Sequence, residues 1–359
     1  MPRPGRVPWA LLAVACIAGP PPAMAVEPIT CDTGISAASI RFFDGHDHLP
    51  EIANAAEGEA ELDALALEGV PLGMLALATP NSVANAAALE MQSVSAYPVF
   101  AFARAPTVLV GGVKTLDESS LNAVRGQLDA GATGIGEITL RHSGPPALAA
   151  DIPANHPVAM AIYAEAAARN VPVSIHFELR DKSAPGVDIP ARIEEFRAAL
   201  GGNPDTRFLW AHMGDSGPET VGALLAEFEN LYADISTRNP YFVRGWPMAL
   251  QSLGTGSDGM GGLKPAWKNV FEAHADRIVF GLDLASEDRK DQVSDVMAFY
   301  RAMLGEVSAA TAERIACKNA RALLTTPALP SARAIGVAVL VLALLAVGYG
   351  YLQRTLRNS

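Results

Sequence analysis

Two histidines, His46 and His48, stand one residue apart at the end of a short apolar stretch. Side chains two positions apart on a β-strand point to the same face, so both imidazoles can reach one ion. Neutral imidazole is the commonest metal ligand in proteins, and it suits zinc and iron. The pair therefore predicts half of a metal site, with manganese as a further possible ion.

Four other residues that bind metals or transfer protons lie at or near the ends of later apolar stretches. They are Glu137, His176, His212 and Asp283. Any one of them has a simple structural explanation as a hydrogen-bonded polar residue at a strand end. Glu137 has a second explanation, an ion pair with nearby Arg141. The convergence of all six on one place is the stronger interpretation.

A scaffold that brings these residues together must place many strand ends side by side. From Ile40 onward, apolar strands alternate with helical segments. The expected strands cover 40–48, 70–77, 99–102, 134–138, 171–176, 207–212, 231–236 and 277–283. The expected helices cover 49–68, 82–95, 119–130, 157–169, 189–200, 220–228, 267–274 and 291–304.

Eight apolar strands separated by helices indicate a parallel sheet covered on both faces. The pattern favours an α/β fold of the (β/α)₈ TIM-barrel type, in which the active site lies at the C-terminal ends of the strands. An open doubly wound sheet is the alternative. No Gly-x-Gly-x-x-Gly turn follows the first expected strand, so nucleotide binding has no support there.

The six residues together resemble the site of the amidohydrolase superfamily, which are metal-dependent barrel hydrolases. The resemblance is strongest to the amidohydrolase-2 branch and covers nearly the whole barrel. Five stretches are similar to strand and helix motifs of that branch: 134–138, 208–214, 230–236, 280–283 and 319–324.

The resemblance implies a divalent ion held by the His46-x-His48 pair, His176 and Asp283, with zinc as the expected metal and manganese or iron as alternatives. Such an ion lowers the pKa of bound water toward neutrality, and Asp283 takes the proton and later passes it to the leaving group. His212 then polarises the substrate or binds a second ion. Glu137 is similar to the bridging carboxylate of TatD-type relatives, so one or two ions are expected.

The expected function is hydrolysis of a small ester, lactone or amide. A metal-dependent decarboxylase of the same branch is the first alternative, and a catalytically inactive metal-binding surface module is the second. The expected partner is a small-molecule substrate. Nucleic acid is not expected, because the formal net charge of −11 repels phosphate backbones.

Both ends of the chain differ from the barrel in composition. Residues 1–25 are typical of a signal peptide, with arginines before a short apolar run and a small-x-small cleavage site. The barrel domain is expected over 26–325, followed by a linker at 326–333. An uncharged stretch at 334–352 predicts a transmembrane helix, with a cytoplasmic tail at 353–359. The chain is therefore predicted to be a single-pass protein of the bacterial inner membrane with a periplasmic catalytic domain.

Two cysteines remain once the predicted signal peptide is removed. Cys31 precedes the first expected strand and Cys317 lies in the last expected helical region. The first and last elements of a closed barrel are neighbours, and an oxidising compartment allows thiols to pair. A disulfide is expected, with two free buried thiols as the alternative.

Overall fold

A computed structural model of the chain describes residues 31, 40–48, 52, 54–67, 74–76, 84–144, 149–180, 186–242 and 252–325. All of them belong to the larger of the chain's two units, Cys31–Ser359. The predicted signal peptide and the predicted linker, transmembrane stretch and tail after residue 325 lie outside the described residues.

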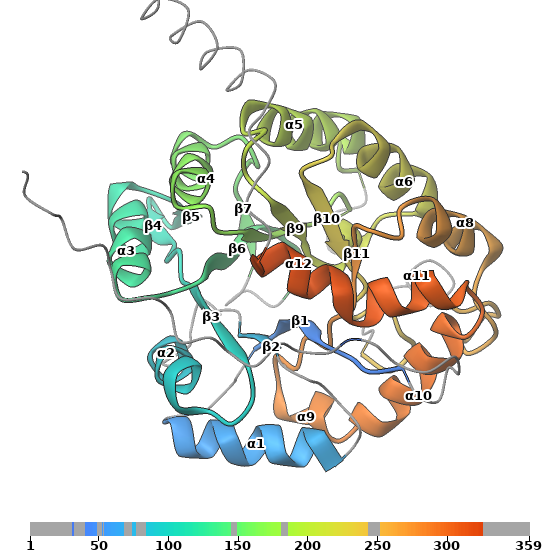
Figure 1. The fold of residues 1–359 in the computed structure, drawn as a ribbon. Coiled ribbons are helices and arrows are strands. Elements are labelled where there is room, and N and C mark those ends of the chain that lie inside the picture. Colours follow the sequence, from blue (N-terminus) through green and yellow to red (C-terminus); the bar gives the residue numbers. More distant parts are fainter. Residues whose placement is uncertain are drawn as a thin grey trace, which may run out of the picture. The chain divides into compact units, whose positions relative to one another are not determined.

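Eight parallel strands form the central sheet, and they follow one another in space in the same order as in the sequence (Figure 1). They are β1 (Asp44–Asp47), β2 (Met74–Ala76), β3 (Val99–Ala103), β6 (Gly134–His142), β8 (Val173–Phe177), β9 (Phe208–Trp210), β10 (Leu231–Asp234) and β11 (Ile278–Val279).

Backbone hydrogen bonds join the two ends of this sheet. Gly45 N donates to Phe280 O at 2.8 Å, and Asp283 N donates to His46 O at 2.7 Å. The first strand thus pairs with the residues that follow the last one. The α/β, TIM-barrel-like fold predicted from the alternation of strands and helices is confirmed, and the strand ends that carry the histidines face one common centre.

Helices connect and cover the strands. Those described are α1 (Ala55–Leu67), α2 (Ala84–Val94), α3 (Glu118–Asp129), α4 (Pro157–Arg169), α5 (Ile189–Gly202), α6 (Pro218–Glu227), α8 (Pro265–Ala273), α9 (Glu287–Lys290), α10 (Val293–Leu304), α11 (Ala309–Glu313) and α12 (Asn319–Thr325), with the helical turns η2 (Ala211–Asp215) and η3 (Arg314–Lys318). Proline in the first turn of α4, α5, α6 and α8 explains where these helices begin, because its missing N–H needs no partner there.

Three short strands were not predicted. β4 (Val108–Val110) and β5 (Val113–Thr115) form a hairpin, and β7 (Ala150–Asp151) pairs antiparallel with β6. Gly111 and Gly112 connect the hairpin strands with positive φ, which a two-residue hairpin turn requires. These strands are additions to the barrel pattern and carry none of the six predicted site residues.

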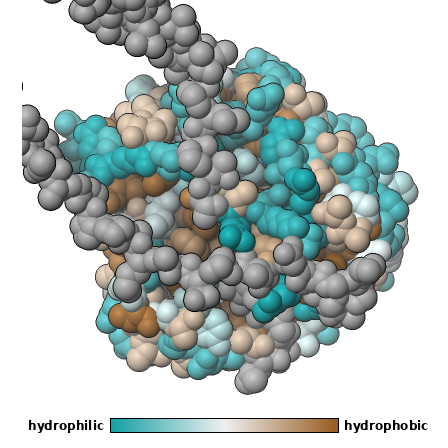
Figure 2. Space-filling model, in the orientation of Figure 1, coloured by the Kyte–Doolittle hydropathy of each residue, from teal (hydrophilic) through white to brown (hydrophobic). Residues whose placement is uncertain are grey.

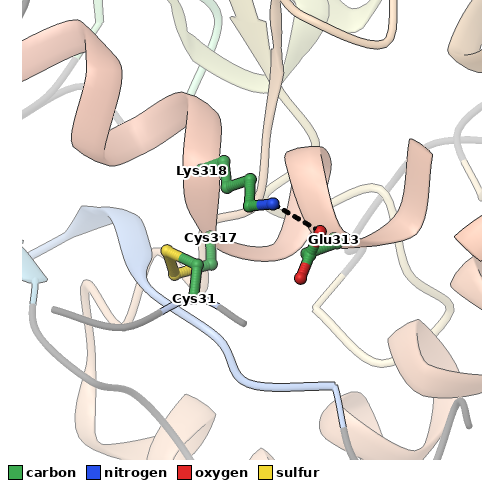
Figure 3. The surroundings of a disulfide bond; sticks show 4 residues. All are labelled: Cys31, Glu313, Cys317 and Lys318. Atoms are coloured by element: carbon green, nitrogen blue, oxygen red, sulfur yellow. Dashed lines mark hydrogen bonds and ion pairs between the residues drawn. A yellow bond between two sulfur atoms is a disulfide. The ribbon is translucent and has the colours of Figure 1, made fainter. Parts of the chain in front are cut away.

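The predicted disulfide is present and joins Cys31 to Cys317 in η3 (Figure 3). Beside it, Phe43 N donates to Ala316 O at 2.8 Å. Lys318 pairs with Glu313 at 2.6 Å within the same helical region. The bond therefore fastens the residues before β1 to the end of the barrel.

The predicted inner-membrane location is wrong. A helix needs about 20 consecutive apolar residues to cross a bilayer, and α5, with 14 residues, is the longest helix in the described part of the chain. No helix within the described ranges is both long and apolar enough for this role. The stretch at 334–352 on which the prediction rested lies outside those ranges. On the face shown in Figure 2, hydrophilic residues cover much of the described surface, with smaller apolar areas between them.

Candidate metal centre

All six predicted site residues lie together where the parallel strands end. His46, His48, His176, His212 and Asp283 are buried, and the Glu137 side chain is about 10 % exposed. We call this set the histidine centre. His46 belongs to β1, Glu137 to β6 and His176 to β8, while His212 lies in η2 just after β9, and Asp283 lies four residues after β11.

Four side chains of the histidine centre face one another at distances longer than the usual 2.7–3.2 Å of an N–H···O hydrogen bond. His46 Nε2 lies 3.7 Å from Asp283 Oδ1 and 3.9 Å from Glu137 Oε1. His48 Nε2 lies 3.4 Å from Asp283 Oδ1 and 3.6 Å from Glu137 Oε2. Two ligand atoms that each lie about 2.0–2.1 Å from one tetrahedral ion are separated by roughly 3.4 Å. The spacing therefore fits a shared divalent ion.

The His46 side chain gives independent support for this fit. Its Nδ1 lies 2.9 Å from Asp234 Oδ2, so the ionised carboxylate accepts the Nδ1–H. Its Nε2 is buried and has no hydrogen-bond partner. A buried polar atom without a partner is costly, and its lone pair points toward the other ligands. An ion at this place satisfies it.

His212 is oriented in the same way. Ser236 Oγ donates to Asp234 Oδ1 and lies 2.7 Å from His212 Nδ1. Because the hydroxyl proton goes to Asp234, the hydroxyl oxygen accepts the Nδ1–H of His212. His212 Nε2 then carries the lone pair and lies 3.7 Å from Asp283 Oδ2. Asp234 thus fixes two imidazoles at once.

His176 contacts a carboxylate on each side. Its Nδ1 lies 3.0 Å from Glu137 Oε1, and its Nε2 lies 3.2 Å from Glu178 Oε1. Glu178 Oε2 in turn accepts the backbone N–H of Ser143 at 2.8 Å. Glu178 therefore orients His176 through Nε2, as Asp234 orients His46 through Nδ1. The Nδ1 atom of His176 faces Glu137.

Local backbone geometry turns several of these side chains inward. His212 and Asp283 adopt left-handed φ values of 53° and 56°, which are uncommon for residues with a Cβ and are concentrated at functional sites. Gly136, before Glu137, has φ of 129°, and a Cβ there would lie 2.4 Å from Ser174 O. Only glycine lets β6 approach β8 so closely.

The charges of the histidine centre favour a cation. Burial lowers the pKa of His46, but Asp234, Glu137 and Asp283 outweigh it and raise the pKa to about 10. Burial also raises the pKa of Glu137, yet His176 and the other histidines hold it well below its usual range. Without an ion, the neighbouring carboxylates favour the protonated forms of His46 and His176. A divalent ion replaces such protons when it binds.

Two of the groups of side chains that could hold an ion share Glu137. One contains His46 and His48, and the other contains His176 and His212. Two other groups are less suitable. The group of His46, His212 and Asp234 uses nitrogens that already bond to Asp234 or Ser236.

The remaining group adds His142 to His176 and Glu178. His142 Nδ1 accepts the backbone N–H of Gly144 at 2.9 Å, so its proton lies on Nε2. Neither ring nitrogen then offers a lone pair to an ion. The His142 ring packs against His176 in a tilted arrangement with ring centroids 4.4 Å apart, which is packing rather than ligation.

Arg141 does not pair with Glu137, in contrast to the structural alternative considered above. It contacts Asp151 and lies 2.8 Å from Glu195, and Arg192 lies 3.6 Å from Asp151. We call these four residues the rim network. Glu137 instead contacts histidines.

Sequence reasoning missed several residues that contact the histidine centre, among them Asp234, Glu178 and Arg289. Asp234 ends an apolar strand just as His176 does, so a signal was present. Glu178 follows His176 by two residues, which places it on the same face of an extended chain. Arg289, from α9, contacts the Asp283 carboxylate and has no such local signal.

Comparison with known proteins identifies the family. A family model described as amidohydrolase matches residues 43–325. No curated protein matches the chain in sequence. Among solved structures, an uncharacterised TIM-barrel protein from Bordetella bronchiseptica aligns with a TM-score of 0.55 and 14 % identity, covering 79 % of this chain and 98 % of its own.

A 2,6-dihydroxybenzoate decarboxylase from Rhizobium is also similar, with a TM-score of 0.50, 14 % identity and coverage of 79 % of this chain and 98 % of its own. At this identity, the two structures support the fold alone. The match of the family model over most of the chain, together with the barrel and its histidine centre, shows that this chain belongs to the amidohydrolase family, in its amidohydrolase-2 branch.

Proposed function

We propose that the chain is a metal-dependent hydrolase of small esters, lactones or amides. The observation that carries the proposal is the gap between His46, His48, Glu137 and Asp283, whose facing atoms are 3.4–3.9 Å apart and include the unpartnered His46 Nε2. Zinc is the expected ion, with manganese or iron as alternatives. A bound divalent ion supplies Lewis acidity and brings the pKa of water toward neutrality.

The residues proposed to hold the ion are His46, His48, Glu137, His176 and Asp283. The two ligand groups that share Glu137 support two ions, with His176 and His212 on the second side. Metal content separates the possibilities. About two ions per chain make Glu137 the bridge, whereas about one leaves Glu137 as a support for His176.

Asp283 is the proposed proton carrier. Its Oδ1 faces the His46 and His48 nitrogens, while its Oδ2 faces His212 Nε2 at 3.7 Å. A carboxylate in this position can accept the proton of the attacking water and return it to the leaving group. Arg289 contacts the same Oδ2, so the carboxylate is least basic while that contact lasts.

His212 has a narrower role than the sequence alone allowed. Burial lowers its pKa, so the imidazole is neutral near pH 7 and its single proton is held by Ser236. Nε2 then presents a lone pair. In this state His212 binds an ion or accepts a proton, and it can polarise a substrate oxygen only after it has taken up a proton.

The test is turnover of a panel of small esters, lactones and amides by the zinc- or manganese-loaded chain, followed by proton release and by trapping of carbon dioxide. Asp283→Asn should lower kcat by about 10²–10⁴-fold, because the proton carrier is lost. The matched control is Glu195→Gln in the rim network, which should leave kcat unchanged. Release of carbon dioxide would assign a decarboxylase instead, and metal binding without any turnover would assign an inactive binding module.

A further inference from the structure

Arg289 contacts the carboxylate of Asp283, which is one of the proposed ligands of the metal centre. Its Nη1 contacts both Oδ2 and the backbone oxygen of Asp283. The Arg289 side chain is 23 % exposed, whereas that of Asp283 is 6 % exposed. The guanidinium therefore reaches inward from the more open side of the centre.

A divalent ion and this guanidinium compete for the same negative charge. Asp283 Oδ1 lies 3.4 Å from His48 Nε2 and 3.7 Å from His46 Nε2, so an ion between these atoms would be one carboxylate width from Arg289. Two cations at such a separation repel each other strongly when they are shielded from water. The Asp283–Arg289 contact and a filled ion site therefore oppose one another.

Arg289 has a second partner, Phe242, in the same conformation in which it contacts Asp283. Its guanidinium lies over the Phe242 ring, 5.3 Å from the centroid, and a cation is stabilised on an aromatic face. Phe242 is held by a hydrogen bond from its N–H to Asn239 Oδ1 at 2.9 Å. The helix that carries Arg289, α9, has only four residues, and its N-cap Ser286 makes no side-chain capping bond. Phe242 would therefore still stabilise the Arg289 charge if the guanidinium moved away from Asp283.

We propose that Arg289 is a displaceable internal cation, which neutralises Asp283 in the metal-free chain and leaves it when a divalent ion binds. The inference rests on the metal centre of the proposed function. Arg289 then lowers the metal affinity of the site, because ion binding breaks the Asp283–Arg289 contact. In the metal-free chain, that contact neutralises the buried Asp283 carboxylate.

The experiment compares zinc affinity and thermal unfolding in Arg289→Gln, Arg289→Lys and the wild type. Lys290→Gln is the matched control, because Lys290 lies in the same short helix but pairs with Glu61 and Glu287. Zinc dissociation constants are measured by competition with a chelating dye. Unfolding temperatures are measured with and without zinc.

Arg289→Gln should bind zinc about tenfold to hundredfold more tightly, which corresponds to the loss of one charge-assisted contact. Without zinc it should unfold at a lower temperature than the wild type, and with saturating zinc the difference should vanish. Arg289→Lys should stay close to the wild type, and Lys290→Gln should show unchanged zinc affinity. Equal or weaker zinc binding by Arg289→Gln would overturn the exchange.

Different results would overturn the Arg289 exchange and the proposed hydrolase. A chain that binds zinc, shows the Arg289→Gln effect and hydrolyses nothing would remove the hydrolase and keep the exchange. A chain that hydrolyses its substrate but whose zinc affinity does not change in Arg289→Gln would keep the hydrolase and remove the exchange. If neither the wild type nor any variant binds zinc, manganese or iron, both are wrong.

Discussion

The histidine centre and the rim network each combine basic side chains with carboxylates, yet they are packed differently. In the rim network, Arg141 lies 2.8 Å from Glu195 and also contacts Asp151, so its charges neutralise one another directly. In the histidine centre, the His46 and His48 Nε2 atoms stand 3.4–3.9 Å from the Glu137 and Asp283 oxygens, and His46 Nε2 has no hydrogen-bond partner. The paired charges of the rim network need no further partner, whereas the more widely spaced groups of the histidine centre can accept a cation.

The largest expected effect is a loss of metal affinity, and it tests the difference between the histidine centre and the rim network. Asp234→Asn keeps the shape of the side chain but removes the charge that orients His46 and His212. Loss of a carboxylate behind a ligating histidine typically weakens metal binding by about 10–100-fold. Zinc competition titration measures it. Glu195→Gln serves as the matched rim control, and an Asp234→Asn protein with wild-type affinity would mean that the histidines need no such support.

A moderate effect is expected in the rim network itself. Glu195→Gln leaves Arg141 with Asp151 alone, and Asp151 is largely exposed. The free energy of unfolding should fall by about 1–2 kcal/mol, a value reduced because solvent screens the partly exposed pair. The unfolding temperature should drop by a few degrees while kcat and metal content stay unchanged. Loss of metal from this variant would show that the rim network is part of the site.

The smallest effect concerns His142, which lies between the two regions. Burial lowers its pKa from an ordinary 6.5 to about 3. Below about pH 6.5, His142 is therefore protonated in the unfolded chain but stays neutral in the folded chain. His142 thus contributes stability that is fully present above pH 6.5 and is lost as the pH falls toward 3. In metal-free protein, His142→Gln should reduce the loss of stability between pH 7 and 5.5 by on the order of 1 kcal/mol.

Urea unfolding of the metal-free wild type and of His142→Gln at both pH values measures this difference. The zinc content of the variant should match that of the wild type, since His142 Nδ1 is occupied by Gly144. A fall in zinc content would instead place His142 among the ligands, together with His176 and Glu178.

Much of the barrel was predictable because its signals are local. The helix predicted at 157–169 has the bounds of α4, and the strands predicted at 99–102 and 231–236 overlap β3 and β10. Pairing of the barrel's two ends was predicted only as a consequence of the fold class. The β4–β5 hairpin was missed because its strands are three residues long, and short antiparallel pairs give little periodicity.

The convergence of the candidate site residues was predictable from residue types, but their individual contacts were not. Histidines and acids at the ends of apolar runs identified the six members of the histidine centre, because parallel strand ends must converge. The support of two imidazoles by Asp234 depends on how β1, β9 and β10 lie in space, which no local pattern encodes. The contact between Arg289 and Asp283 depends on where α9 folds back.

The disulfide turns most of the described chain into a covalent ring, since Cys31 and Cys317 are 286 positions apart. Any single peptide bond cut between these two residues leaves both pieces joined through sulfur. A protein nicked in one of its barrel loops would therefore keep its full mass on a gel run without reductant. Only reduction would separate the fragments, so digestion experiments on this chain report backbone cleavage only after the thiols have been freed.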